Sequence, residues 1–186
     1  MDHDDIRIFV SEAAEKPQAE EDLDTLAAET EALRESGNLD TAKRLGRELA
    51  SLSAQSPELT ALAQSFGFAL NPARERQLQV LMVFSGQHAL RAQLTQLLSE
   101  AAVTAMNNYL INYAKPFWDT ISDGSAFTQY LLVAPMHKAT QAQAVGDAFA
   151  RMCGQEDNTD LHRLGSTLFA TAAELVKARW EEAAVR

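Results

Sequence analysis

Residues 79–100 read QVLMVFSGQHALRAQLTQLLSE, and their apolar pattern places them at the centre of the predicted fold. In a helix, the five apolar side chains of Val80–Phe84 point in every direction around the axis, so they need neighbours on all sides. The helical pattern continues without a stop signal over residues 72–114. We therefore predict a central helix there, either as one long helix or as two helices that meet near Ser85–Gly86.

A bundle seam is predicted in the second half of this segment. From Leu90 onward, the pattern repeats with alternating steps of four and three residues, which is the spacing of a helix seam. This spacing predicts that Asn108 faces the bundle interior with its amide hydrogen-bonded, because an unpaired buried amide would cost roughly 1 to 3 kcal/mol. The predicted seam positions are Leu90, Leu94, Leu97, Ala101, Thr104, Asn108 and Ile111.

The rest of the chain also has a helical pattern. Apolar residues recur at helical spacing, with neither alternating strand patterns nor Asn-Gly hairpin signals. We expect an all-α, single-domain helical bundle around a long central helix or helix pair (residues 72–114), with an N-terminal acidic helical hairpin. Cap and proline signals predict helix starts at Asn38, Pro57 and Pro72. Further helices are predicted at 4–15, 19–35, between Ser125 and Pro135, at 138–152 and at 159–184, with a turn at 116–124.

The N-terminal hairpin has a distinctive turn. Leu26 and Leu33 lie seven residues apart on its first helix, and the Gly-Asn-Leu-Asp stretch at 37–40 leads into the second. The arrangement resembles one tetratricopeptide-type hairpin, although Thr30 and Gly46 replace packing residues of that repeat. Because no second copy follows about 34 residues on, and repeat arrays need several units to bury a core, we interpret the segment as a plain helical hairpin.

Negative charge gathers near the N-terminus. Residues 1–36 contain twelve acids and three basic residues, so they carry nearly all of the net charge of −10. We predict an acidic N-terminal helical region at 1–55, held less firmly than the rest, and a helical bundle core at 56–186. Phosphate backbones and anionic lipids repel a chain this acidic, so neither nucleic acid nor a membrane is expected as a partner.

The cysteine and histidine patterns argue against metal centres. The single Cys153 has no partner for a disulfide or for a C-x-x-C zinc site. None of the four histidines has the Glu-x-x-His or His-x-x-x-His spacing that puts two ligands on one helical face. We therefore expect no metal and no cofactor. With no secretory signal and no apolar run longer than Val80–Phe84, the chain is expected to be cytoplasmic.

The most unusual composition lies in residues 107–124, NNYLINYAKPFWDTISDG. Aromatic walls with a few amides and one charge pair suit a small-molecule pocket between helices, since rings bury ligand area and amides fix its orientation. The alternative is that the aromatic residues cap the end of the bundle and Asn108 fixes helix register. The candidate ligand-binding residues are Asn108, Tyr109, Asn112, Tyr113, Lys115, Trp118 and His137.

The acidic N-terminal region carries a leucine stripe formed by Leu23, Leu26 and Leu33. As a docking element, the stripe would engage a groove on a partner while the acids steer the encounter. As a structural element, it would pack on the chain's own core, with the acids in solvent. The three leucines are therefore candidate partner-binding residues.

The sequence leaves three functional hypotheses. We prefer a non-enzymatic helical protein-interaction or regulatory protein, because no G-x-S-x-G elbow or P-loop is found. Its partner would be another protein or a second copy in a homodimer. The second hypothesis is a small-molecule-sensing helical ligand-binding domain that uses the aromatic patch at 107–119. The third is an enzyme, since active sites assemble from distant residues; it would use Tyr113, Lys115, Asp119 or His137.

Overall fold

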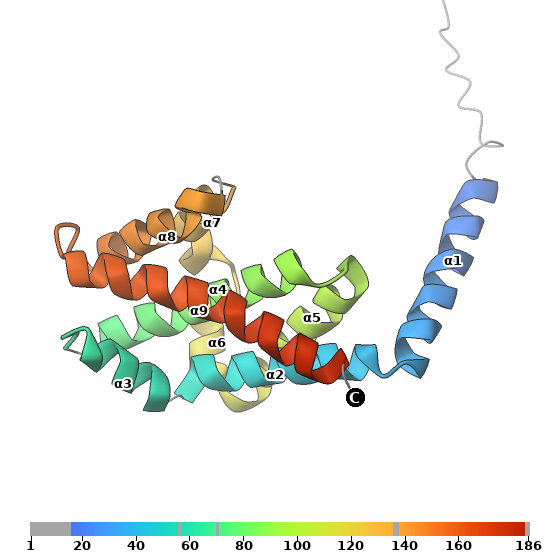
Figure 1. Cartoon of the computed structure of the whole chain (residues 1–186), viewed down its shortest axis with the longest axis horizontal. Coiled ribbons are helices and arrows are strands. Elements are labelled where there is room, and N and C mark those ends of the chain that lie inside the picture. The colour runs from blue at the N-terminus through green and yellow to red at the C-terminus, as the bar shows by residue number, and fades with distance from the viewer. Residues whose placement is uncertain (1–15, 56, 70, 136–137, 185–186) are drawn as a thin grey trace, which may run out of the picture. The chain divides into compact units, whose positions relative to one another are not determined.

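The computed structural model describes residues 16–55, 57–69, 71–135 and 138–184. These residues form helices joined by short turns, and no strand occurs among them. The fold is therefore an all-α bundle, as predicted (Figure 1). The chain divides into two compact units, residues 1–38 and residues 39–186.

In the first unit the structure describes one helix, α1 (Lys16–Glu35). It is followed by a turn at Gly37, where φ is +73°. Glycine suits this left-handed conformation because it has no Cβ to clash with the backbone. The later elements are α2 (Asn38–Gln55), α3 (Pro57–Ser65), α4 (Pro72–Gln93), α5 (Gln96–Tyr113), α6 (Lys115–Ile121), η1 (Ser125–Phe127), α7 (Thr128–Val133), α8 (Lys138–Met152) and α9 (Thr159–Ala184).

From Leu39 onward, α2 belongs to the second unit, whereas the sequence suggested a boundary after residue 55. The reason is that α2 has a strongly apolar face. Ala42, Leu45 and Leu49 are all buried. The second half of the predicted hairpin is therefore part of the core of the second unit.

The central segment is a pair of helices whose break lies later than the sequence suggested. α4 ends at Gln93 and α5 begins at Gln96, so the chain changes direction at Leu94 and Thr95 rather than near Ser85–Gly86. Thr95 has extended backbone angles, with φ −60° and ψ 162°, as a residue at the cap position often does. A glycine costs a helix only about 1 kcal/mol relative to alanine, so Gly86 does not have to end a well-buried helix.

Burial of α4 on all sides is confirmed. Residues 80–86 are all buried, and α4 contacts α5, α8, α9 and η1. Aromatic packing extends this core, because the ring of Phe84 stacks on that of Tyr130 with centroids 5.0 Å apart. Both side chains are buried, so they add apolar area and a favourable ring geometry to the centre of the bundle.

The seam predicted through Asn108 is wrong, because Asn108 is exposed. That seam carried the register of Leu90 across residues 94–95, where the helix does not continue. α5 starts a new register after the break, and its more apolar face turns inward while Thr104 and Asn108 face solvent. The fully or nearly buried positions that step by four along α5 are Leu98, Ala102, Met106 and Leu110.

Cap and proline signals predicted most helix starts correctly. α2 begins at Asn38 and α3 begins at Pro57. Asn71 caps α4, because its side-chain oxygen accepts a hydrogen bond of 2.9 Å from the backbone N–H of Arg74. This bond satisfies one of the free N–H groups at the helix start.

The turn predicted at 116–124 is wrong in its first part, because α6 occupies Lys115–Ile121. Proline fits the first turn of a helix, where its missing N–H costs nothing, so Pro116 lies in the first turn of α6 rather than in a loop. The last helix, α9, has the predicted bounds of 159–184. The helix predicted at 4–15 lies outside the described residues.

Two close helix approaches depend on glycine. A Cβ at Gly46 of α2 would lie 2.0 Å from the backbone oxygen of Ala102 on α5. A Cβ at Gly165 of α9 would lie 2.9 Å from the Cα of Gly146 on α8. In both places the backbones come closer than any side chain would allow, so the glycines fix where these helices cross.

Candidate functional site

A groove lies between α2 and α5 in the second unit, and we call it the α2–α5 groove. Its volume is about 560 Å³, and its α5 wall runs from Leu97 to Tyr113. The α2 wall carries Lys43 and Arg47, which lie one helical turn apart. These residues flank Gly46, where α2 and α5 are in backbone contact. The groove therefore follows from the crossing of the two helices.

The groove is cationic on one wall and mainly aromatic, amide-bearing and apolar on the other. No carboxylate of the described residues forms an ion pair with Arg47, and Glu100 is the acid that lines the groove. The rings of Tyr109 and Tyr113 lie 4.7 Å apart, and Tyr113 is 71% exposed. Such a surface suits a ligand that combines apolar area with negative charge.

Four of the seven predicted ligand-binding residues line this groove, and they are Asn108, Tyr109, Asn112 and Tyr113. Their spacing puts them on one face of α5, because residues four apart are neighbours on a helix. Lys115 and Trp118 lie on α6, outside the groove lining, and Lys115 Nζ pairs with Asp119 Oδ1 at 2.8 Å. His137 lies outside the described residues.

The leucine stripe of α1 is largely exposed in the first unit. Leu23 is 65% exposed and Leu26 is 45% exposed, while Leu33 is half-buried. Thr30, which lies between them on the same face, donates its hydroxyl to the carbonyl of Leu26 at 2.7 Å. The acids of α1 therefore frame an apolar stripe that is open to solvent.

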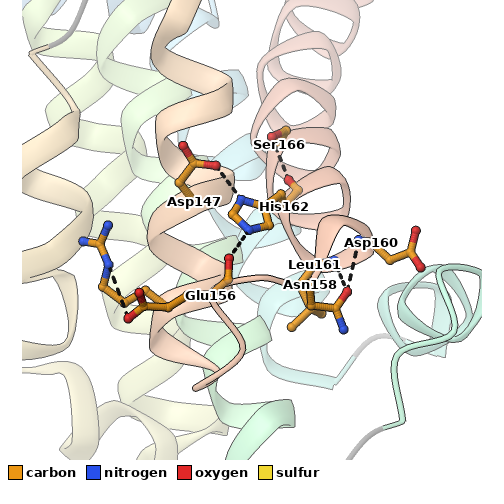
Figure 2. Close-up of polar contacts among 8 residues, drawn as sticks. Asp147, Glu156, Asn158, Asp160, Leu161, His162 and Ser166 are labelled. Carbon is orange, nitrogen blue, oxygen red and sulfur yellow. Dashed lines mark hydrogen bonds and ion pairs between the residues drawn. The ribbon is translucent and has the colours of Figure 1, made fainter.

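A second polar cluster joins α8, α9 and the loop between them, as Figure 2 shows. His162 Nδ1 lies 2.5 Å from Asp147 Oδ1, and its Nε2 lies 2.6 Å from the backbone oxygen of Glu156. Both partners are acceptors, so the ring donates from both nitrogens as an imidazolium. The hydrogen bond with Asp147, followed by that with the Glu156 carbonyl, raises the pKa of His162 above its ordinary value of 6.5.

The same cluster has the residue types of a Ser-His-Asp triad but not its geometry. Ser166 Oγ donates to the backbone carbonyl of His162 at 2.8 Å. A general base needs a free ring nitrogen to accept the proton of the serine, whereas Asp147 and Glu156 occupy both nitrogens here. The cluster therefore ties the α8–α9 loop to two helices. Sequence reasoning missed it because no motif links residues 147 and 162.

Two other reactive side chains, those of His88 and Cys153, are half-buried. The ring of His88 lies against those of Phe84 and Phe169, with centroids 6.0 Å and 5.2 Å away, and burial lowers the pKa of His88. Burial raises the pKa of Cys153 to about 11, so its thiol stays protonated near neutral pH. The imidazole of His88 and the thiol of Cys153 are therefore both uncharged near neutral pH.

No group of three or more His, Cys, Asp or Glu side chains that could hold a metal ion occurs in the part of the chain that the structure describes. None of the described helices combines the length and the apolar character that crossing a bilayer requires.

The chain matches no family model, no curated protein and no solved structure.

Proposed function

We propose that this chain is a non-enzymatic helical protein-interaction or regulatory protein, and that α1 binds its protein partner. One observation carries the proposal: Leu23 and Leu26 are 65% and 45% exposed on a helix that holds seven acids and two basic residues. An apolar stripe framed by charge is the surface with which an amphipathic helix enters a groove on a partner.

The energetics favour a covered stripe. Fully burying a leucine side chain is worth about 1.5 to 3 kcal/mol, and α1 leaves much of this unused at Leu23 and Leu26. The acids around the stripe would speed association with a basic surface by steering the encounter. Burial of the leucines would then supply affinity, while charge would supply rate and specificity.

The proposed partner is a protein rather than nucleic acid or a lipid surface. The net charge of −10 repels both phosphate backbones and anionic membranes. We further propose a cytoplasmic setting, which agrees with the free thiol of Cys153. This setting also agrees with the absence of any disulfide partner for that residue in the sequence.

Affinity capture tests the proposal. The full chain would be immobilised and exposed to an extract of its native host, in parallel with a Leu23→Glu/Leu26→Glu variant. A Leu131→Glu/Leu132→Glu variant is the matched control, because these leucines of α7 are 58% and 70% exposed and the charge change is the same. We expect the α1 variant to lose a specific partner that the parent and the control retain. Equal capture by all three chains would contradict the proposal.

Small-molecule sensing is the second candidate function. It is supported by the grouping of Asn108, Tyr109, Asn112 and Tyr113 in one groove with two cations. The test is a thermal-shift screen of anionic metabolites against the parent and Tyr109→Ala. A ligand that raises the Tm of the parent but not that of the variant would favour sensing. No shift with any compound would count against it.

A further inference from the structure

We propose that the α2–α5 groove binds the α1 helix of a second copy of the chain, so that the chain associates with itself through this contact. The inference rests on the proposed function of α1 as a docking helix, and it names a second copy as one partner of that helix. Three properties of the groove carry it: its length, its charge and its apolar surface.

The length of the groove fits a helix better than a small molecule. Its α5 wall extends from Leu97 to Tyr113. At 1.5 Å per residue this corresponds to roughly 24 Å of helix. The leucine stripe of α1, from Leu23 to Leu33, covers about 15 Å by the same measure. The stripe can therefore lie within the groove, whereas a small molecule would cover only part of it.

The charges of the groove and of α1 are complementary. Arg47 has no ion-pair partner among the described residues, and Lys43 Nζ makes only a long contact of 3.8 Å with Asp40. On α1, the acids outnumber the basic residues by seven to two. Two cations on one wall would therefore attract the acidic helix α1, and the single acid of the groove lining, Glu100, lies on the other wall.

The apolar surface of the groove can receive leucine side chains. Ala101 and Ala105 are small and half-buried, and they leave room along α5 next to Leu97. The ring of Tyr109 is half-buried beside the more exposed ring of Tyr113. Aromatic rings and small residues along a groove are the surface into which the leucines of an amphipathic helix pack.

Sedimentation of the full chain over a range of micromolar concentrations tests the inference. We expect the parent to form a reversible oligomer. For Leu26→Glu we expect the association constant to fall roughly tenfold or more, since a leucine anchor is replaced by a charge. Leu132→Glu, at another exposed leucine, is expected to associate like the parent. A parent that stays monomeric at every concentration would overturn the inference.

The groove itself is tested by a pair of variants on one helix. Arg44 and Arg47 are both exposed on α2, but Arg44 lines a different pocket, next to Arg179 of α9. Arg47→Glu is expected to weaken association, whereas Arg44→Glu, with the same charge change, is expected to leave it nearly unchanged. If Arg44→Glu weakened association more than Arg47→Glu did, the contact would lie elsewhere and the inference would be overturned.

Mixing two defective chains gives the sharpest result. In a mixture of Leu26→Glu and Arg47→Glu chains, an intact α1 on one copy can meet an intact groove on the other. We therefore expect mixed oligomers to form at concentrations where neither variant associates alone, and failure of the mixture to associate would overturn the inference.

Because the capture experiment is separate, self-association can fail while α1-dependent capture of another protein persists. That outcome rejects this inference and leaves the proposed function standing.

Discussion

At the scale of single residues, His162 stands out because both of its ring nitrogens are hydrogen-bonded. Its ring donates to Asp147 and to the carbonyl of Glu156, so the charged form is favoured in the folded chain. These hydrogen bonds raise the pKa of His162 above 6.5. A raised pKa in the folded state means that His162 stabilises the fold fully below its unfolded pKa, and that this contribution is lost as the pH rises through the folded pKa.

His162→Gln should therefore reveal a pH-dependent loss of stability. We expect the difference in Tm between parent and variant to be largest below about pH 6 and to shrink over the alkaline range, as the pH rises through the raised folded pKa of His162. Thermal unfolding across this range measures the difference. In an NMR titration of the parent, His88 is the internal control, because burial lowers its pKa. Titration of His162 at a lower pH than His88 would contradict the described hydrogen bonds.

Gly46 is the residue on which the crossing of α2 and α5 depends. A Cβ there would lie 2.0 Å from the oxygen of Ala102, so Gly46→Ala must force the helices apart. We expect the free energy of unfolding to fall by about 2 kcal/mol or more, since the overpacking exceeds the gain in helix propensity. Chemical denaturation provides the measurement.

Gly86→Ala is the matched control for this substitution. It also lies within a helix, but the nearest atom to its added Cβ would be the flexible Cε of Met106 at 3.4 Å. We expect this variant to be neutral or more stable by up to about 1 kcal/mol, because alanine favours the helix. Equal stability of the Gly46 and Gly86 variants would show that the crossing is not as close as described.

At the scale of helices, sequence signals predicted where helices begin better than which face of a helix is buried. Asn71 and the following proline marked the start of α4 because capping is a local interaction within a few residues. The face of α5 was predicted wrongly, since Asn108 was assigned to a register that the break at Leu94–Thr95 resets. Thr95 is a residue type that N-caps favour, but its side chain makes no capping hydrogen bond and no proline follows it, so the sequence signal for this break was weak.

α1 should exchange its amide hydrogens much faster than α4. None of the side chains at residues 23–35 is buried, whereas residues 80–86 are all buried. Local opening of α1 therefore exposes little apolar surface and costs little free energy. Hydrogen exchange on the dilute full chain measures this, and higher ionic strength should slow exchange in α1 modestly by screening its acids. Exchange in α1 as slow as in α4 would reject this description.

At the scale of the whole molecule, the candidate site was predictable only in part. Four residues of the groove lie within one short stretch of α5, so composition was enough to predict them. Lys43 and Arg47 come from α2, and only the crossing at Gly46 brings them to the same groove. Contacts between residues far apart in sequence depend on helix packing, which a helical pattern alone does not specify.

The charge of the chain is likewise a property of the whole molecule. Residues 1–36 carry nearly all of the net charge of −10, so the rest of the chain is close to neutral. The chain therefore has two different surfaces. α1 is acidic and has exposed leucines, whereas the bundle is nearly neutral and has one cationic groove wall. This contrast agrees with the assignment of partner binding to α1, which rests on the exposed Leu23 and Leu26.

The most direct test of that assignment is hydrogen exchange on the chain purified with its bound partner from the native host, compared with the isolated chain at low concentration. We expect residues 16–35 to gain most of the protection in the complex, because the exposed stripe of α1 becomes covered. Protection that appears only elsewhere, such as around His162 or on α7, with exchange in α1 unchanged, would contradict it.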